Sequence, residues 1–289
     1  MAVVYINGRY LPQGEASVSI EDRGYQFADG IYEYIAFYNR TPLDEAPHLK
    51  RMARSLKELG IPMPVTQAAF KIILREMIER NGRDHGGIYI QVTRGVARRD
   101  HAFPKQAVKP ALSITICTAK FPKRKEVEEG VHVITHPDLR WARRDIKSIA
   151  LLPNVLAKQE AVKHKAREAW LLEGDTVTEG AVSNAYIVTK EGALVTHPAD
   201  EHILGGITRE AVLKLAAQAG VKVMEKPCTL TDMKNATEAF QTSTSINVLP
   251  VVKVGDIVIG DGKVGPVTRK LQQLYIAHIH KETGWQWAV

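Results

Sequence analysis

The chain has 289 residues, of which 45% are apolar and 25% are charged, as in an ordinary globular protein of one large or two modest domains. No stretch stays uncharged for long enough to cross a bilayer, and the N-terminal segment lacks a long apolar run. We therefore expect a cytoplasmic protein that has no membrane partner.

The two cysteines and the net charge exclude further classes of protein. Neither Cys117 nor Cys228 has a second cysteine or a histidine at metal-ligand spacing, so we expect no disulfide framework and no metal. The formal charge of +7 would suit a nucleic-acid partner. Acidic residues are interleaved with the basic clusters, however, and an anionic small molecule explains the same excess, so we expect no nucleic acid.

The first part of the chain predicts a small α/β domain over residues 1–120. The strand-like segments VVYI and RYLP flank an Asn-Gly pair, which favours a tight hairpin turn. Residues 30–40 predict a strand in which Tyr32, Tyr34 and Ala36 share one face. Further elements are expected as helices near residues 48–59 and 66–81, with Thr66 as the cap, and as strands at residues 87–94 and 111–119.

The rest of the chain predicts a larger domain over residues 131–289. The charged, proline-containing segment 121–130 is expected to be an interdomain linker. Short strands punctuated by glycine turns favour a barrel-like sheet, and hence an α+β fold overall. Strands are expected at residues 131–136, 169–172, 185–189, 193–197 and 253–262, and helices near residues 155–168, 208–219 and 267–282.

A first candidate for chemistry is Lys147, in the sequence DIKSIALL. The apolar run that follows would place its stem in a mostly dry site, where a lysine can lose its proton and attack an aldehyde. The alternative is a solvated lysine, since the chain has 39 basic residues. The familiar nucleotide, zinc-protease and hydrolase motifs are absent from the sequence.

Four other stretches are consistent with a phosphorylated aldehyde cofactor. Glu179, before a glycine, could keep a pyridine nitrogen protonated, or it could be an exposed turn residue. The segment GGITRE predicts a helix start at which the amides of Ile207 and Thr208 could bind phosphate, or an ordinary capped helix. Arg51, Ser243 and Thr244 could also contact the phosphate. Alternatively, Arg51 is a surface residue and the two hydroxyl residues belong to a turn.

Several strings together resemble the D-amino acid aminotransferases, members of the fold-type IV enzymes that depend on pyridoxal 5'-phosphate (PLP). In order from about residue 20 to 275 they are EDRGYQFADGIYE, QVTRG, ARRDHAFP, DIKS, NVLAKQEA, TVTEG, GITRE and DGKVGPVTRKLQ. The resemblance implies a homodimer of two-domain subunits, each with a small α/β N-terminal domain and a larger pseudo-barrel C-terminal domain.

The resemblance also implies roles for individual residues. Lys147 would be the Schiff-base lysine, and Glu179 would pair with the ring nitrogen. Leu204 would pack against the cofactor ring, and the phosphate would be held by Arg51, Ile207, Thr208, Ser243 and Thr244. The substrate carboxylate would be bound by Tyr32 from one subunit and by Arg99 and His101 from the other. Arg98 is adjacent, but the spacing to His101 favours Arg99.

The implied reaction is ping-pong transfer of an amino group between a D-amino acid and a 2-oxo acid such as 2-oxoglutarate, through a Lys147 aldimine. This chain departs from the family pattern at Ala181 and Val182, where small hydroxyl residues are usual. The alternatives are a branched-chain L-amino acid aminotransferase, an (R)-amine transaminase, an aminodeoxychorismate lyase or, outside enzymes, a polyanion binder.

Overall fold

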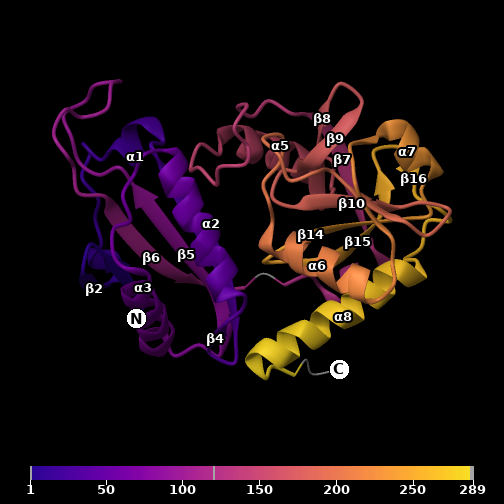
Figure 1. The fold of residues 1–289 in the computed structure, drawn as a ribbon, viewed down its shortest axis with the longest axis horizontal. Helices are drawn as coiled ribbons and strands as arrows, with labels where there is room; N and C mark the ends of the chain where they lie inside the picture. Colours follow the sequence, from indigo (N-terminus) through magenta and orange to yellow (C-terminus); the bar gives the residue numbers. More distant parts are fainter. Residues whose placement is uncertain (1, 120, 287–289) are drawn as a thin grey trace. The chain divides into compact units, whose positions relative to one another are not determined.

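The computed structural model describes residues 2–119 and 121–286, which divide into two compact units (Figure 1). Unit 1 comprises the described residues up to Ala119, the short segment Ile146–Ala150 and the described residues from Ile279 onward. Unit 2 comprises residues 121–145 and Leu151–His278. Each unit is described by itself.

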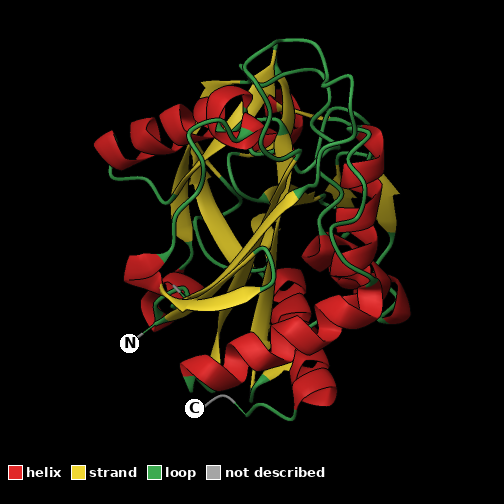
Figure 2. Cartoon of the chain, turned by 90° about the vertical axis from the view of Figure 1, so that its left-hand side faces the viewer, coloured by secondary structure: helices red, strands yellow, loops and turns green. Residues whose placement is uncertain are grey.

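Unit 1 is built on a six-stranded antiparallel sheet in the order β2-β1-β6-β5-β3-β4. The predicted hairpin is confirmed, because Asn7 and Gly8 take positive φ angles of 49° and 97° and the strands on either side pair. The strands are twisted, as Figure 2 shows. Their bounds are β1 Val3–Ile6, β2 Arg9–Pro12, β3 Gly30–Tyr38, β4 Thr41–Pro42, β5 His85–Thr93 and β6 Ala111–Cys117.

Two amphipathic helices cover one face of this sheet. Helix α2 (Glu45–Glu58) and helix α3 (Gln67–Asn81) bury apolar side chains against Ile31 and Ile35 of β3 and against the neighbouring strands. The Thr66 hydroxyl accepts from the amide of Ala69 at 3.2 Å, so the predicted cap is confirmed. Because side chains alternate along a strand, Tyr32 lies on the opposite face. Unit 1 also contains η1 (Gln13–Glu15) and α1 (Arg23–Phe27).

Unit 2 is built on a ten-stranded sheet with the path β12-β11-β10-β14-β15-β7-β8-β9-β13, and β16 pairs with β15. Its largest core cluster includes Trp170, Leu249 and Val133. The strand bounds are β7 Val131–Pro137, β8 Glu168–Glu173, β9 Thr176–Gly180, β10 Asn184–Val188, β11 Leu194–Thr196, β12 Val223–Glu225, β13 Cys228–Thr229, β14 Glu238–Ser243, β15 Asn247–Val254 and β16 Ile257–Val258.

One helix was not predicted, and another has different bounds from those expected. Helix α4 (Arg124–Glu129) lies within residues 121–130, and its carbonyl groups at Val127 and Glu128 accept from Arg269. The interdomain linker at 121–130 stays a prediction. The helix expected at 155–168 is α5 (Leu152–Lys163), which starts earlier because Pro153 suits a first helical turn. The others are α6 (Ile207–Gln218), α7 (Leu230–Asn235) and α8 (Pro266–Thr283). None of the described helices has the length and apolar character to span a membrane.

Candidate active site

Lys147 lies in the segment Ile146–Ala150, which pairs with strand β3 in unit 1. The Lys147 carbonyl accepts from the amide of Tyr32 at 2.9 Å, and the amide of Ile149 donates to the carbonyl of Gly30 at 3.1 Å. Ile146, directly before the lysine, is 4% exposed and belongs to the core cluster of the unit. The backbone on both sides of Lys147 is therefore fixed by a strand and by the core.

The side chain of Lys147 points over an aromatic ring. Its Nζ lies 4.2 Å from the centre of the Tyr32 ring. The Tyr32 ring stacks on Tyr89, with 5.7 Å between the ring centres and 28° between the planes. The structure thus brings together two of the residues predicted for the site, Lys147 and Tyr32.

Arg51, predicted to contact phosphate, is held by a buried carboxylate. Its Nε donates to Glu33 Oε2 at 3.0 Å and its Nη2 donates to Glu33 Oε1 at 2.6 Å, so the pairing is bidentate. His48 Nδ1 lies 3.0 Å from Glu33 Oε1. Although burial opposes ionisation, Arg51 and His48 hold the pKa of Glu33 well below its usual value. An ionised Glu33 fixes the direction of the Arg51 fork.

Arg99 and His101 lie in the loop that follows β5. The Arg99 guanidinium carbon is 5.0 Å from the centre of the Phe27 ring, and the His101 ring centre is 5.3 Å from it. Both residues are exposed. Among residues 2–119 and 121–286, no hydrogen bond or ring contact joins them to Lys147 or Tyr32.

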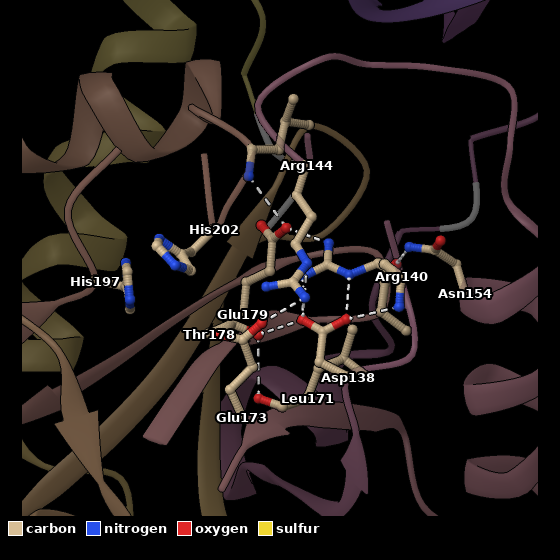
Figure 3. A network of polar contacts seen from close by, with 12 residues as sticks. Asp138, Arg140, Arg144, Asn154, Leu171, Glu173, Thr178, Glu179, His197 and His202 are labelled. Atoms are coloured by element: carbon tan, nitrogen blue, oxygen red, sulfur yellow. Dashed lines mark hydrogen bonds and ion pairs between the residues drawn. The ribbon is translucent and has the colours of Figure 1, made fainter. Parts of the chain in front are cut away.

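Glu179 is a buried carboxylate in strand β9 of unit 2, with an exposed fraction of 4%. Arg140 Nη1 donates to Oε1 (Figure 3). The amide of Leu204 also donates to Oε1, at 3.1 Å, and Asn184 Nδ2 donates to Oε2 at 2.9 Å. Burial raises the pKa of Glu179, while Arg140 and the Leu204 amide oppose the rise. The structure thus joins two of the predicted residues, Glu179 and Leu204, by a hydrogen bond.

The arginine beside Glu179 is itself fixed by a second carboxylate, that of Asp138 (Figure 3). Arg140 Nε donates to Asp138 Oδ1 at 2.9 Å and Nη2 donates to Oδ2 at 2.7 Å. The hydroxyl of Thr178 donates to Asp138 Oδ2 at 2.7 Å. Burial opposes ionisation of Asp138, but these donors hold its pKa below the usual value. Arg140 therefore stays protonated, with its charge shared between two buried carboxylates.

The start of helix α6 carries Ile207 and Thr208, as predicted. The N-cap is Gly206, which supplies no capping side chain, so the first turn presents backbone amides. A Cβ at Gly206 would lie 2.1 Å from Asn184 Oδ1, the same amide side chain that contacts Glu179. The Glu179 carboxylate and the mouth of α6 are thus connected through Asn184.

Ser243 and Thr244 lie where strand β14 turns into strand β15. Ser243 ends β14, and Asn247 begins β15 in the left-handed region with φ of 57°. The Ser243 hydroxyl lies 3.2 Å from the Ser245 hydroxyl, and both predicted residues are half-buried. The two residues thus lie at a turn of unit 2, and their contact with a phosphate stays a prediction.

Three residues of this arrangement were not found by sequence reasoning: Asp138, Arg140 and Asn184. The sequence signal for Asp138 and Arg140 is their Asp-x-Arg spacing shortly before Lys147, but the basic residues that follow make this spacing hard to recognise. Asn184 stands in an apolar strand, VSNAYIV, where a lone amide gives no indication of its partner.

Known proteins that are similar to this chain are aminotransferases. The family model described as amino-transferase class IV matches residues 30–254. A D-alanine aminotransferase of Staphylococcus haemolyticus is 45% identical over 285 residues, covering 98% of this chain and 100% of that protein. One of Bacillus licheniformis is 41% identical over 280 residues, covering 97% and 98%.

Two solved structures confirm the expected fold-type IV architecture. The branched-chain amino acid aminotransferase of Escherichia coli superposes with a TM-score of 0.88 at 24% identity, covering 99% of this chain and 97% of that one. The T.th. branched-chain amino acid aminotransferase with pyridoxamine 5'-phosphate gives 0.87 at 26% identity, covering 98% and 94%. The chain belongs to the amino-transferase class IV family.

Proposed function

We propose that this chain is a PLP-dependent aminotransferase that moves an amino group between a D-amino acid, D-alanine foremost, and a 2-oxo acid such as 2-oxoglutarate. Relatives at 41–45% identity over nearly the whole chain are D-alanine aminotransferases. The main structural support is the buried Glu179 carboxylate. It accepts hydrogen bonds from Arg140 and Asn184, and Asn184 lies against Gly206 at the start of α6.

The residues present fit this cofactor in their chemistry. A pyridine nitrogen needs an acidic partner, and Glu179 is a buried carboxylate with fixed direction. A phosphate needs amide donors at the start of a helix, and the N-cap of α6 is a glycine, which has no side chain to cap these amides. An aldehyde needs a lysine, and Lys147 is a half-buried residue whose backbone is hydrogen-bonded to strand β3.

In the proposed reaction, bound PLP supplies an aldehyde carbon that carries the amino group and a ring that accepts electrons from the substrate α-carbon. Lys147 Nζ would remove the α-proton of the first substrate and would return a proton in the reverse transfer to the second substrate. Glu179 would keep the ring nitrogen protonated. The amides of Ile207 and Thr208, with Arg51, Ser243 and Thr244, would bind the phosphate, and Leu204 would pack against the ring.

Binding of the substrate carboxylate is proposed for Tyr32, Arg99 and His101. Tyr34 and Ala36 share a strand face with Tyr32 and would contact the substrate side chain. Hydroxyl contacts are lost at Ala181, which is 3% exposed, and at Val182, which is 55% exposed.

We further propose a homodimer in which Arg99 and His101 serve the site of the partner subunit. Helix α5 supports it, since Leu152, Val155 and Leu156 are 68%, 58% and 56% exposed at spacings that put them on one helix face. Sedimentation of the purified protein tests the oligomeric state. A cytoplasmic location stays a prediction of the sequence.

The deciding experiment combines a spectrum with a stereochemical assay. The protein purified with PLP should be yellow, and borohydride should remove the visible band and add the cofactor mass at Lys147. D-alanine with 2-oxoglutarate should yield pyruvate, whereas L-alanine should not. Lys147→Ala should abolish turnover, and Lys190→Ala, at an exposed turn of unit 2, should not.

Two outcomes would contradict the proposal. A preference for L-leucine or L-valine would move the assignment to branched-chain transamination, the activity named for the solved structure with pyridoxamine 5'-phosphate. Turnover by Lys147→Ala at the wild-type rate would end the assigned role of the lysine.

A further inference from the structure

The loop that carries Arg99 and His101, residues 94–103, is exposed at its tip and held from beneath by one buried arginine. Arg23, in helix α1, is 2% exposed. Its Nη1 donates to the carbonyl of Asp100 at 2.6 Å, and its Nη2 donates to the carbonyl of His101 at 3.5 Å. These two consecutive carbonyls belong to the backbone that connects Arg99 to His101, so Arg23 fixes the path of that backbone.

Arg23 is in turn oriented by Asp29. Its Nε donates to Asp29 Oδ2 at 2.8 Å. Asp29 also accepts hydrogen bonds from Arg94, the first residue of the loop, from Nε at 2.7 Å and from Nη2 at 3.0 Å. Arg94 Nη2 continues to the carbonyl of Leu59, at the end of α2, at 2.7 Å. One carboxylate therefore joins the loop start, the residue beneath the loop tip and the neighbouring helix.

The ring of Phe27, on the same short helix, contacts the two side chains themselves. The guanidinium carbon of Arg99 lies 5.0 Å from the ring centre and the His101 ring lies 5.3 Å from it. Arg23 lies against the same ring at 4.9 Å. Helix α1 thus holds both the loop backbone and the side chains that project from it.

The base of the loop is attached to the same segment. The amide of Arg23 donates to the carbonyl of Gly95 at 2.9 Å, and the hydroxyl of Thr93 donates to Asp22 Oδ2 at 2.8 Å. A Cβ at Gly24 would lie 2.2 Å from Thr93 Cγ2, so the two segments are in close contact. The loop is anchored at its start and near its tip without help from a ligand.

We propose that Arg23 is a positioning residue for the substrate carboxylate. It holds the backbone of residues 99–101 in place before substrate arrives, and Phe27 sets the direction of the Arg99 and His101 side chains. The inference rests on the proposed function, since that function assigns the carboxylate to these two residues. A loop that is ordered before binding loses less conformational entropy when substrate binds. Arg23 should therefore act mainly on substrate affinity.

The test uses Arg23→Lys, Arg23→Gln and Phe27→Leu in the full-length protein. Lysine keeps a charge for Asp29 but replaces the planar fork of arginine by a single nitrogen, and Phe27→Leu leaves the ion pairs intact. The matched control is Arg40→Gln, an arginine of the same unit whose partners Asp84 and Glu79 are at the surface. KM for D-alanine and for 2-oxoglutarate should rise about tenfold in the Arg23 variants, because charge-assisted hydrogen bonds are lost, with kcat changed much less.

A second readout does not depend on activity. Trypsin can cut after Arg98, Arg99 and Lys105, which are exposed. In the cofactor-free protein, cleavage at these sites should be faster in both Arg23 variants than in the wild type or Arg40→Gln. If neither Arg23 variant folds, Phe27→Leu decides, with a rise in both KM values expected.

Wild-type KM values and a wild-type tryptic pattern in folded Arg23 variants would overturn the inference. Arg23 variants in which only the affinity for the cofactor falls would also overturn it. A wild-type protein that does not use D-amino acids would instead refute the proposed function, and the tryptic rates would then decide alone whether Arg23 holds the loop.

Discussion

The side-chain amide of Asn184 donates to Glu179 Oε2 at 2.9 Å and thereby fixes the second oxygen of that carboxylate. The same Nδ2 lies 2.9 Å from the carbonyl of Leu204, so one buried amide group joins strand β10, strand β9 and the segment before α6. This relationship predicts that Asn184 acts on cofactor binding although it carries no charge.

Asn184→Ala should weaken PLP binding, because Glu179 loses a donor and can rotate away from the ring nitrogen. Loss of one hydrogen bond to a charged group corresponds to about 1.5–3 kcal/mol, or roughly tenfold to a hundredfold in the dissociation constant. Absorbance titration of the cofactor-free protein measures it. Asn235→Ala, at an exposed helix end, is the control. Equal affinity in both variants would contradict the assigned role of Asn184.

Two adjacent glycines before α6 should respond differently to alanine. A Cβ at Gly206 would lie 2.1 Å from Asn184 Oδ1, whereas a Cβ at Gly205 meets only Ala199, at 3.8 Å. Gly206→Ala should therefore displace the Asn184 amide and reduce cofactor affinity, while Gly205→Ala should bind PLP as the wild type does. The same titration compares them, and a stronger effect at Gly205 would refute the steric argument.

Removal of Arg140 should destabilise the cofactor-free protein in a pH-dependent way. Arg140→Ala leaves Asp138 and Glu179 as buried carboxylates without their shared cation, which costs about 3–5 kcal/mol in the free energy of unfolding at neutral pH. Arg143→Ala, whose side chain is 44% exposed, should cost less than about 1 kcal/mol. Urea unfolding followed by circular dichroism gives both values.

The sign of the pH effect follows from the pKa values. In the wild type the pKa of Asp138 is below its usual value of 3.8, so the stability that this group contributes is lost only as pH falls below that value. In Arg140→Ala the folded pKa values of Asp138 and Glu179 rise, and the folded state takes up protons earlier. The difference in the free energy of unfolding between the wild type and Arg140→Ala should therefore become smaller from pH 7 to about pH 4. Arg140→Lys, which keeps a charge, should lose less free energy of unfolding than Arg140→Ala. A difference between the wild type and Arg140→Ala that becomes larger on acidification would contradict this account.

Mixed dimers test whether Arg99 serves the partner's site. Lys147→Ala and Arg99→Ala proteins should each be impaired alone. After the subunits are unfolded and refolded together, a mixed dimer has one site with an intact Lys147 that faces an intact Arg99. About a quarter of all sites in a random mixture should then be restored, because half of the dimers are mixed. If activity does not rise above that of the two separate proteins, Arg99 acts within its own subunit.

The sequence predicted those features that depend on neighbours along the chain. The Asn-Gly turn, the Thr66 cap and the glycine before α6 are local, and the structure has all three. The burial of the Arg140 side chain was not predicted, because its partner Glu179 lies 39 residues away. Helix α4 was missed for the same reason, since Arg269 is 142 residues from Val127. The domain boundaries at 120 and 131 stay a prediction.

The segment Ile146–Ala150 has a consequence for the construction of chimaeras. These five residues belong to unit 1, while the chain before and after them belongs to unit 2. A gene fusion that joins the first 120 residues of one family member to the remainder of another would give β3 a foreign pairing segment at the lysine itself. Recombination between relatives should therefore succeed when positions 146–150 are exchanged together with β3, and a single crossover should give poorly folded hybrids.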